Sequence, residues 1–468
     1  MMLWTAQEAQ TATGGQTPVD WAVNGISIDT RTLQPGDLFV ALKAARDGHD
    51  FVAQALEKGA GAALVTHVPE GVNADAPLLI VEDVQRALED LGQAARARTD
   101  AKVVAVTGSV GKTSTKEMLT SMLRDQGKTH AAVASYNNHW GVPLTLARMP
   151  RDTEFAVIEA GMNHPGEIAP LAQQARPHVA MVTTVAAVHL EAFDDVAGIA
   201  REKAAILTGL EPGGTAILNA DVETADVLAQ AAAEQGCTTR WFGKASATHK
   251  LLSVATEGEA TLAQVSIADQ PHALSIQSLG AHFAMNALGA LACVEALGAD
   301  VKRAVQSLAL WSPVTGRGAR LELPWDDGTL TVLDDSYNAN PTSVAAALSV
   351  LALVPAKGRK IAVLGDMKEL GPDEIPMHQA LAELAALDEI DTVHGVGPLM
   401  SHLHAALPPG KKGQHWRATQ DAIAQLPSQL KAGDVLLAKG SLSIGLGKLV
   451  DALRDMSDAR ANSKNNHS

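Results

Sequence analysis

Apolar and polar positions alternate in a regular way along the middle of the chain. Short apolar runs, which suit buried strands, are followed by longer stretches whose apolar residues recur at helical spacing. The strand candidates are residues 103–106, 155–158, 179–185 and 216–218, and the helical patterns include residues 112–123 and 197–210. Strands that alternate with helices in this way predict a parallel sheet with helices on its faces.

The last third of the chain repeats this alternation after a break that contains proline and glycine at residues 313–318. Its strand candidates are residues 330–333, 361–364, 392–396 and 435–438, and its helical patterns are residues 345–353, 378–387 and 419–426. We predict a second, doubly wound α/β unit here. Between the two units, residues 250–278 alternate like strands without helices, which predicts an antiparallel patch, and a helix is expected at residues 282–297.

The pattern divides the 468 residues into three domains and a tail, in line with about 100–200 residues per domain. The first domain, residues 1–98, has short apolar runs at 36–42, 62–66 and 78–81, a helical pattern at 51–58 and a linking helix at 87–97. A central domain then spans residues 99–312, a C-terminal α/β domain spans 313–455, and the polar stretch 456–468 is expected to be a flexible tail. The predicted fold class is therefore α/β with three domains.

Composition and charge narrow the class of protein. Apolar residues make up 46% of the chain, enough to bury several cores. The formal net charge of −15 argues against nucleic acid or an anionic membrane as the main partner. Cys237 and Cys293 lie far apart in no metal-like or redox-like spacing. With neither a signal peptide nor an apolar run long enough to span a membrane, the chain is expected to be soluble and cytoplasmic.

The sequence T-G-S-V-G-K-T at residues 107–113 stands directly after an apolar strand and before a helical pattern. Glycines allow a turn tight enough for backbone N–H groups to surround phosphate oxygens, and the following helix presents its positive end to the anion. The pattern is shorter than the usual P-loop, since Val106 stands where its first glycine would be. The predicted phosphate-binding residues are Gly108, Ser109, Val110, Gly111, Lys112, Thr113 and Ser114, with the Thr113 hydroxyl offered to Mg²⁺.

Polar residues follow several apolar strands at their carboxyl ends, where open α/β sheets bind ligands. Glu159, Asp335 and Asp366 come after strand candidates, and His189 lies just beyond another. Carboxylates near a triphosphate suit Mg²⁺, which prefers oxygen ligands. Taken singly, each is explained as well by a helix cap or a solvated turn, and Lys203, on a helical pattern, by a solvated surface charge.

Three further polar motifs lie on turns or on one helix face. They are Asn137 and Asn138 within residues 136–144, Tyr337 and Asn338 within residues 335–341, and the pair His282 and Asn286 at helical spacing. Capping loops and the polar flank of an amphipathic helix explain these residues without any function.

Taken in order, the motifs resemble those of the Mur ligase family over nearly the whole chain. The matching positions are residues 107–113, Asn137 and Asn138, Glu159 with residues 163–167, His189, Lys203, His282 with Asn286, Gly316 with Arg317, and residues 335–341. Residues 26–31, 36–42 and 47–51 resemble the family's UDP-binding domain. Residues 335–341, 365–371 and 439–441 resemble the branch of the family that adds D-alanyl-D-alanine.

This resemblance implies an ATP-dependent amide-bond ligase of bacterial cell-wall synthesis. Its expected substrates are a UDP-N-acetylmuramoyl tripeptide and D-alanyl-D-alanine, joined through an acyl phosphate, and its expected cofactors are ATP and two Mg²⁺ ions. It is expected to act as a monomer and to bind no nucleic acid. Whether the third residue of the peptide is diaminopimelate or lysine stays open.

The resemblance also implies roles for individual residues. Lys112, Glu159, His189 and Lys203 would be catalytic, and the metal ligands would be Thr113, Glu159, His189 and a Lys203 carbamylated by CO₂. Asn286, Arg317 and Asp335 would join the nucleotide site. The substrate-binding residues would be Ser27, Asp29, Arg31, His49, Asn137, Asn138, His164, Tyr337 and Asn338.

Three positions depart from the family pattern, and two other classes of function remain as alternatives. Ala160, Ala44 and Leu442 stand where the family usually has Met, Gly and Arg, and Leu442 leaves the contact to D-alanyl-D-alanine unassigned. A ligase that adds the third amino acid, or a folylpolyglutamate-type synthetase, is disfavoured by residues 335–341 and by the UDP-like first segment. A P-loop nucleotide switch is less consistent with the pairing of His189 and Lys203 and with a whole third α/β unit.

Overall fold

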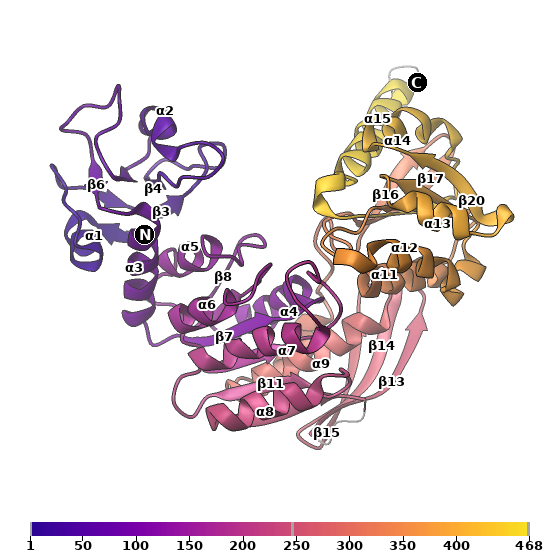
Figure 1. The fold of residues 1–468 in the computed structure, drawn as a ribbon, viewed down its shortest axis with the longest axis horizontal. Coiled ribbons are helices and arrows are strands. Elements are labelled where there is room, and N and C mark those ends of the chain that lie inside the picture. Colours follow the sequence, from indigo (N-terminus) through magenta and orange to yellow (C-terminus); the bar gives the residue numbers. More distant parts are fainter. Residues whose placement is uncertain (1, 245–247, 466–468) are drawn as a thin grey trace.

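A computed structural model of the chain describes residues 2–244 and 248–465, with side chains up to residue 460. Three large sheets lie in three lobes that follow one another along the chain, with the central lobe between the other two (Figure 1). We name them the first, central and third lobes, after sheets whose strands fall within residues 25–80, 102–276 and 319–439. The predicted α/β fold class is confirmed. In the described chain no helix is long and apolar enough to cross a bilayer.

The first lobe is built on a parallel sheet with the strand order β3 (Gly25–Ser27), β4 (Asp37–Val40), β5 (Ala62–Val65) and β6 (Leu78–Ile80). Its other elements are β1 (Trp4–Thr5), α1 (Ala6–Thr13), β2 (Ala22–Val23), the 3-10 helix η1 (Gly48–Phe51), α2 (Val52–Glu57) and α3 (Val84–Ala97). Side chains of β4 alternate between two cores, with Leu38 and Val40 in the core of α1 and α3 and Phe39 in that of α2. The linking helix predicted at residues 87–97 is α3.

The central sheet has nine strands in the order β15-β14-β13-β12-β11-β10-β7-β9-β8. The strands are β7 (Lys102–Thr107), β8 (Thr129–Ala131), β9 (Phe155–Glu159), β10 (Val179–Val182), β11 (Thr215–Asn219), β12 (Thr238–Gly243), β13 (His249–Glu257), β14 (Ala260–Ile267) and β15 (Gln270–Ile276). Pairing is parallel from β8 to β13 and antiparallel from β13 to β15, which confirms the antiparallel patch expected at residues 250–278.

Helices cover both faces of this sheet. They are α4 (Lys112–Arg124), α5 (Gly141–Ala147), α6 (Ile168–Ala175), α7 (Val196–Ala204) with the 3-10 helix η2 (Ala205–Gly209), α8 (Ala225–Gln235), α9 (Ala281–Ala296) and α10 (Val301–Leu308). Val104 and Val106 of β7 pack in one core with α4, α9 and α10, whereas Val103 and Ala105 pack in another with α5 to α8. Because both faces are buried, the parallel strands read as continuous apolar runs.

The third lobe has the strand order β16-β17-β21-β18-β19-β20, parallel except for β16 at the edge. Its strands are β16 (Ala319–Trp325), β17 (Gly328–Asp335), β18 (Lys360–Gly365), β19 (Thr392–Val396), β20 (Lys412–Trp416) and β21 (Val435–Lys439). Its α-helices are α11 (Pro341–Leu353), α12 (Glu374–Ala380), α13 (Met400–Ala406), α14 (Thr419–Gln425) and α15 (Gly447–Asn465). Its 3-10 helices are η3 (Gly371–Asp373), η4 (Leu381–Glu383), η5 (Ala385–Glu389), η6 (Pro409–Lys411), η7 (Pro427–Gln429) and η8 (Leu442–Ile444).

The expected flexible tail is wrong as far as residue 465, because α15 continues through it. Inside the predicted tail, the Ser457 hydroxyl donates to the Pro324 carbonyl, 2.9 Å away. The Arg460 guanidinium also lies 4.0 Å from the centre of the Trp325 ring. These contacts to β16 hold the polar stretch in place. Its apolar residues do not recur at helical spacing, so the sequence pattern did not predict a helix there. Residues 466–468 lie outside the described residues.

Three predicted elements are shorter or more broken than the apolar pattern suggested. The strand expected at residues 179–185 ends at Val182, and the helix expected at 197–210 is α7 followed by the 3-10 helix η2. The helix expected at 378–387 is the end of α12 followed by two short 3-10 helices. In each case apolar residues such as Val185, Leu207 and Leu387 are buried without continuing the element, a distinction that periodicity does not make.

Candidate active site

The loop between β7 and α4 has the backbone geometry of a phosphate cradle. Gly108 and Gly111 adopt φ values of +150° and +89°, a region that side chains rarely enter. A Cβ at Gly108 would lie 1.9 Å from the Thr183 hydroxyl oxygen, and one at Gly111 would lie 2.7 Å from the Asn286 side-chain oxygen. No side chain caps the start of α4. The first N–H groups of a thirteen-residue helix therefore face the loop, which suits an anion.

The segment after β10 holds this loop in place. The Thr183 hydroxyl donates to the Val110 carbonyl at 2.6 Å, and the Ser109 backbone N–H donates to the Thr184 carbonyl at 2.8 Å. The Ser109 hydroxyl bonds both the carbonyl and the N–H of Ala186, at 3.1 and 3.0 Å. The loop and residues 183–186 are therefore one hydrogen-bonded unit, and the position of the loop fixes the position of these four residues.

Two lysines of the central lobe lie in surroundings that disfavour a positive charge. Lys112 donates from Nζ to the Gly108 carbonyl at 2.6 Å, and burial lowers its pKa to about 8. Lys203, on α7, is 1% exposed, and burial, followed by the charge of Lys112, lowers its pKa well below the usual value. Burial is the main cause of both shifts, so an anion bound beside these amines would stabilise their charged forms.

Glu159 closes the other side of the cradle at the end of β9 and is 1% exposed. Its Oε1 accepts from the Thr113 hydroxyl at 3.2 Å and from the Asn137 side-chain amide at 2.7 Å. Its Oε2 is buried and has no hydrogen-bond partner among the described residues. A buried carboxylate oxygen without a donor is costly, so the geometry suits a cation held between Glu159 and Thr113.

His189 lies seven residues beyond β10 and turns toward the third lobe. Its Nδ1 is 2.5 Å from Oε2 of Glu369, and this hydrogen bond lowers the pKa of Glu369. Thr113 and Glu159 thus meet as predicted, whereas His189 is paired with a residue that the sequence did not single out. Among the described residues, no three His, Cys, Asp or Glu side chains are grouped so as to hold a metal ion by themselves.

Arg317 brings a charge from the start of the third lobe to the phosphate loop. Its Nη2 donates to the Ser135 hydroxyl at 3.1 Å, and that hydroxyl lies 3.3 Å from the Thr113 hydroxyl. The guanidinium lies 4.1 Å from the centre of the Tyr337 ring. The positive charge of Arg317 also lowers the pKa of Lys112, by less than burial does. The structure thereby places Arg317 beside the cradle, as the resemblance implied, with Tyr337 packed against it.

Asp335 is paired within the third lobe. Its carboxylate accepts from Nζ of Lys439 at 2.7 Å, and Lys439 also donates to the Asn338 carbonyl at 2.9 Å. Burial raises the pKa of Asp335 although Lys439 opposes the shift. The Asn338 side chain accepts from the N–H of Ala339 at 2.8 Å. The loop at residues 335–341 is therefore held by its own contacts and by Lys439.

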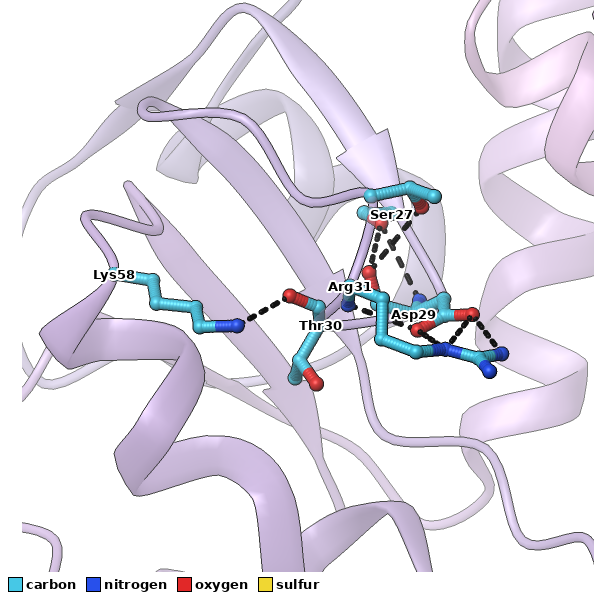
Figure 2. Close-up of polar contacts among 6 residues, drawn as sticks. Ser27, Asp29, Thr30, Arg31 and Lys58 are labelled. Atoms are coloured by element: carbon cyan, nitrogen blue, oxygen red, sulfur yellow. Dashed lines mark hydrogen bonds and ion pairs between the residues drawn. The ribbon is translucent and has the colours of Figure 1, made fainter. Parts of the chain in front are cut away.

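The first lobe presents a different arrangement around the loop after β3 (Figure 2). Arg31 donates to both carboxylate oxygens of Asp29, at 2.6 to 3.0 Å, and its side chain is 86% exposed. The Ser27 hydroxyl donates to the Asp29 carbonyl at 3.0 Å, and Lys58 donates to the Thr30 carbonyl at 2.9 Å. The polar groups satisfy one another at the surface.

The remaining predicted residues are distributed over both lobes. His49 is bonded through Nδ1 to Asp47 at 2.7 Å and accepts from the Thr66 N–H at 2.9 Å. The Asn138 side chain accepts from the N–H groups of residues 140 and 141 at the start of α5, as a capping amide would. His164 is exposed and pairs with Glu167 at 3.2 Å. The Asn137 side-chain amide donates to Glu159 at 2.7 Å, and its role toward the substrate stays a prediction.

Three contributors to the site were missed at the sequence level. Ser135 links Thr113 to Arg317, Thr183 fixes the phosphate loop, and Glu369 bonds His189. Ser135 precedes the motif at residues 136–144 and Thr183 lies inside the strand expected at 179–185, and no pattern marks either hydroxyl. Glu369 lies inside residues 365–371, which resemble a motif of the Mur ligase family. The motif marks this region, but it does not indicate a role for Glu369 itself.

Family comparisons cover all three lobes. The sequence matches the family models of the Mur ligase family catalytic domain over residues 22–96, the Mur ligase middle domain over residues 106–294, and the Mur ligase glutamate ligase domain over residues 319–442. Curated relatives include the UDP-N-acetylmuramoyl-tripeptide--D-alanyl-D-alanine ligase of Escherichia coli, 37% identical over 447 residues, with 93% of this chain and 95% of the relative covered. The enzyme of the same name from Rickettsia prowazekii is 32% identical over 452 residues, with 96% and 99% covered.

Solved structures agree with these relatives in fold. The crystal structure of MurF from Acinetobacter baumannii superposes with a TM-score of 0.83 at 30% identity and covers 97% of this chain and 99% of that chain. MurF from Thermotoga maritima in complex with ADP superposes with a TM-score of 0.77 at 26% identity, covering 94% and 99%. The match therefore runs through all three lobes rather than through the nucleotide-binding lobe alone.

Proposed function

The chain belongs to the Mur ligase family, and on that premise we propose that it joins D-alanyl-D-alanine to a UDP-N-acetylmuramoyl tripeptide at the expense of ATP. The product would be the UDP-N-acetylmuramoyl pentapeptide used to build the cell wall. The observation that carries this proposal is the phosphate cradle, where partly buried Lys112 and buried Glu159 meet Arg317 of another lobe. A site assembled from two lobes suits a reaction that must bring ATP and two further substrates together.

The phosphates of ATP would lie at the start of α4, against the backbone N–H groups of residues 108–114. Lys112 would take up the negative charge, since an anion favours the charged form of an amine whose pKa burial has lowered. Arg317 would approach the same phosphates from the third lobe. Asn286, whose side chain lies beside Gly111, and Asp335 would complete the nucleotide site.

Magnesium fits the same place, because the unpartnered Oε2 of Glu159 and the Thr113 hydroxyl are the oxygen donors that it prefers. His189 and Lys203 would complete a site for two ions. When bound, Mg²⁺ offsets the negative charge of the phosphates during transfer.

Lys203 would serve as a ligand only after modification. A neutral amine forms a bond from Nζ to the carbon of CO₂ and releases a proton to solvent, which leaves an anionic carbamate. The burial of Lys203 lowers its pKa and so favours the neutral amine that this reaction needs. Nuclear magnetic resonance of protein equilibrated with carbon-13-labelled bicarbonate tests this step: a carbamate signal present in the native protein and lost in Lys203→Arg supports it, and its absence from the native protein contradicts it.

The proposed reaction has two steps. A carboxylate oxygen of the tripeptide attacks the γ-phosphorus of ATP, the bond to ADP breaks, and an acyl phosphate forms. The amine of D-alanyl-D-alanine then attacks the carbonyl carbon, phosphate leaves with the electron pair of its C–O bond, and the amine loses a proton. Lys112 and Arg317 would reduce the repulsion between two anions in the first step, and closure of the lobes would keep water from the acyl phosphate.

The other predicted residues would bind the two acceptor substrates. Ser27, Asp29, Arg31 and His49 in the first lobe would contact the UDP-sugar, with Asn137, Asn138 and His164 along the path toward the cradle. Tyr337 and Asn338 would contact the incoming dipeptide. We place the reaction in the cytoplasm, where ATP and UDP-linked precursors are found, and expect a monomer without a nucleic-acid partner.

The test is phosphate release from ATP by the purified protein, with the UDP-N-acetylmuramoyl tripeptide and D-alanyl-D-alanine supplied singly and together. The proposal predicts release only when both are present, together with a gain in mass of the nucleotide-sugar that corresponds to the dipeptide. Release that is indifferent to both would contradict it and would favour a P-loop switch or another nucleotide hydrolase. A control with D-alanyl-D-alanine replaced by L-alanyl-L-alanine should release no phosphate.

A further inference from the structure

We infer that Glu369 is a positioning residue that couples metal binding in the central lobe to the docking of the third lobe. The inference rests on the proposed function, because it concerns the metal site described there. It starts from the 2.5 Å contact between Nδ1 of His189 and Oε2 of Glu369. That contact joins side chains 180 residues apart in sequence and on two lobes.

The contact fixes which nitrogen of His189 is free. A carboxylate oxygen accepts hydrogen bonds, so the contact aims Nδ1 of His189 at Oε2 of Glu369. Nε2 is then the ring nitrogen left to bind an ion. Histidines that bind metals are held in this way, with one ring nitrogen donating to a carboxylate and the other facing the ion.

The loop that leads to Glu369 is hydrogen-bonded into the third lobe. The N–H of Lys368 donates to the Ser441 hydroxyl at 2.9 Å, and the N–H of Met367 donates to Nε2 of His378 at 3.0 Å. The carboxylate of Asp366, at the start of this loop, accepts from the N–H of Met400 at 2.9 Å. The backbone that leads to Glu369 is therefore bonded to α12, to the start of α13 and to the segment after β21, and it moves with the third lobe.

The two loops also meet through their backbones. A Cβ at Gly371 would lie 3.2 Å from the carbonyl of Leu190 and 3.3 Å from the nitrogen of Glu191, so a side chain would push the loops apart. Both His189 and Glu369 have positive φ, +55° and +65°, which is uncommon for residues other than glycine. Tertiary contacts must hold such conformations. Here they are the contacts between the two loops, which belong to different lobes.

The path continues to the phosphate loop. Residues 183–186 are hydrogen-bonded to Ser109 and Val110, and His189 follows three residues later. An ion held with the help of His189 would stabilise the imidazole orientation that Glu369 also requires. By reciprocity, docking of the third lobe strengthens metal binding and metal binding strengthens docking by the same factor. The ion would thus be held most tightly when the lobe that completes the site is in place.

The test uses the full chain with a non-hydrolysable ATP analogue and Mn²⁺, whose free concentration is followed by electron paramagnetic resonance. Glu369→Gln removes the charge and keeps the size, and Glu191→Gln removes an exposed charge two residues from His189 as the matched control. We expect about tenfold weaker Mn²⁺ binding in Glu369→Gln and no change in Glu191→Gln. Equal affinity in Glu369→Gln and Glu191→Gln would overturn the inference.

Two further measurements separate positioning from a general structural role. In a His189→Ala background, Glu369→Gln should weaken Mn²⁺ binding no further, whereas the same tenfold loss in both backgrounds would contradict action through His189. Adding Mn²⁺ with the analogue should slow amide hydrogen exchange in residues 366–371 of the native protein and not in Glu369→Gln. No slowing in the native protein would contradict the coupling. Neither experiment contains a peptide substrate, so their outcome is independent of the phosphate-release test of the proposed function.

Discussion

The central and first lobes both carry charged residues expected to bind phosphate-containing substrates, yet they hold those charges in opposite ways. In the central lobe, Lys203 and Glu159 are each 1% exposed, and one oxygen of Glu159 has no partner among the described residues. In the first lobe, Arg31 is 86% exposed and is bonded to both oxygens of Asp29 (Figure 2). The buried charges of the central lobe therefore leave a polar atom that a ligand could pair with, whereas the charges of the first lobe are already paired with one another.

This difference teaches what each set can do in a reaction. Buried charges that lack partners interact strongly with a ligand because little water screens them, and they are prearranged for charge that develops during phosphoryl transfer. Exposed charges that are already paired must exchange one partner for another, so a ligand gains little binding energy from them. They contribute mainly by selecting ligands of the right geometry. We therefore expect changes in the central lobe to affect catalysis and changes in the first lobe to affect substrate affinity.

The largest effect is expected for Lys112→Met. The substitution removes the cation nearest the phosphate loop without adding a polar group, and ligation should fall about 10²–10³-fold. Phosphate release with both substrates present measures the loss. Lys128→Met is the matched control, because Lys128 is exposed and paired with Asp152 at the surface, and it should stay within about twofold of the native rate. A comparable loss in both variants would mean that burial does not distinguish the two lysines.

A smaller effect, on stability, is expected where the central lobe buries a histidine away from the site. Burial, followed by the charge of Arg240, lowers the pKa of His249 from 6.5 to about 4. Between these values the unfolded chain takes up a proton that the folded protein does not, so stability is present above pH 6.5 and is lost as the pH falls toward 4. The free energy of unfolding should drop by about 2 kcal/mol between pH 6.5 and pH 5 on account of this group.

Urea unfolding of the native protein and of His249→Leu at several pH values measures that slope. The variant should lose stability with falling pH less steeply than the native protein, whatever its absolute stability. Parallel slopes would show that His249 takes up its proton equally well in the folded state, and that burial in the central lobe does not penalise charge as we describe.

The smallest effect is expected for Arg31→Ala in the first lobe. An exposed residue whose interaction is the same in the bound substrate and in the transition state changes KM and leaves kcat unaltered. Loss of one charged hydrogen bond corresponds to about a tenfold rise in KM for the UDP-linked peptide. Steady-state kinetics with that substrate varied provide the measurement. A fall in kcat with unchanged KM would remove the contrast between the two lobes.

The sequence predicted most of what depends on local pattern. The phosphate loop, the strand ends that carry Glu159 and Asp335, and the alternating α/β architecture all follow from short-range spacing of apolar residues and glycines. The sequence could not predict that Asn137 bonds Glu159, that Ser135 joins Thr113 to Arg317, or that Glu369 bonds His189. Each of these contacts joins segments separated along the chain, so it depends on tertiary packing within or between lobes rather than on local spacing. The helix through residues 456–465 was missed for the same reason, since contacts with β16 hold it.

In the proposed reaction ATP activates the terminal carboxylate of the peptide, and transfer of a labelled oxygen reports on that step. The tripeptide substrate would carry a heavy oxygen isotope in that carboxylate, and the released phosphate would be analysed by mass spectrometry after turnover with ATP and D-alanyl-D-alanine. Each phosphate should carry one oxygen from the peptide, because the bond from carbonyl carbon to oxygen breaks when the amine attacks the acyl phosphate. Phosphate free of the label, at full yield of ligated product, would show that the carboxylate is never phosphorylated and would contradict the account.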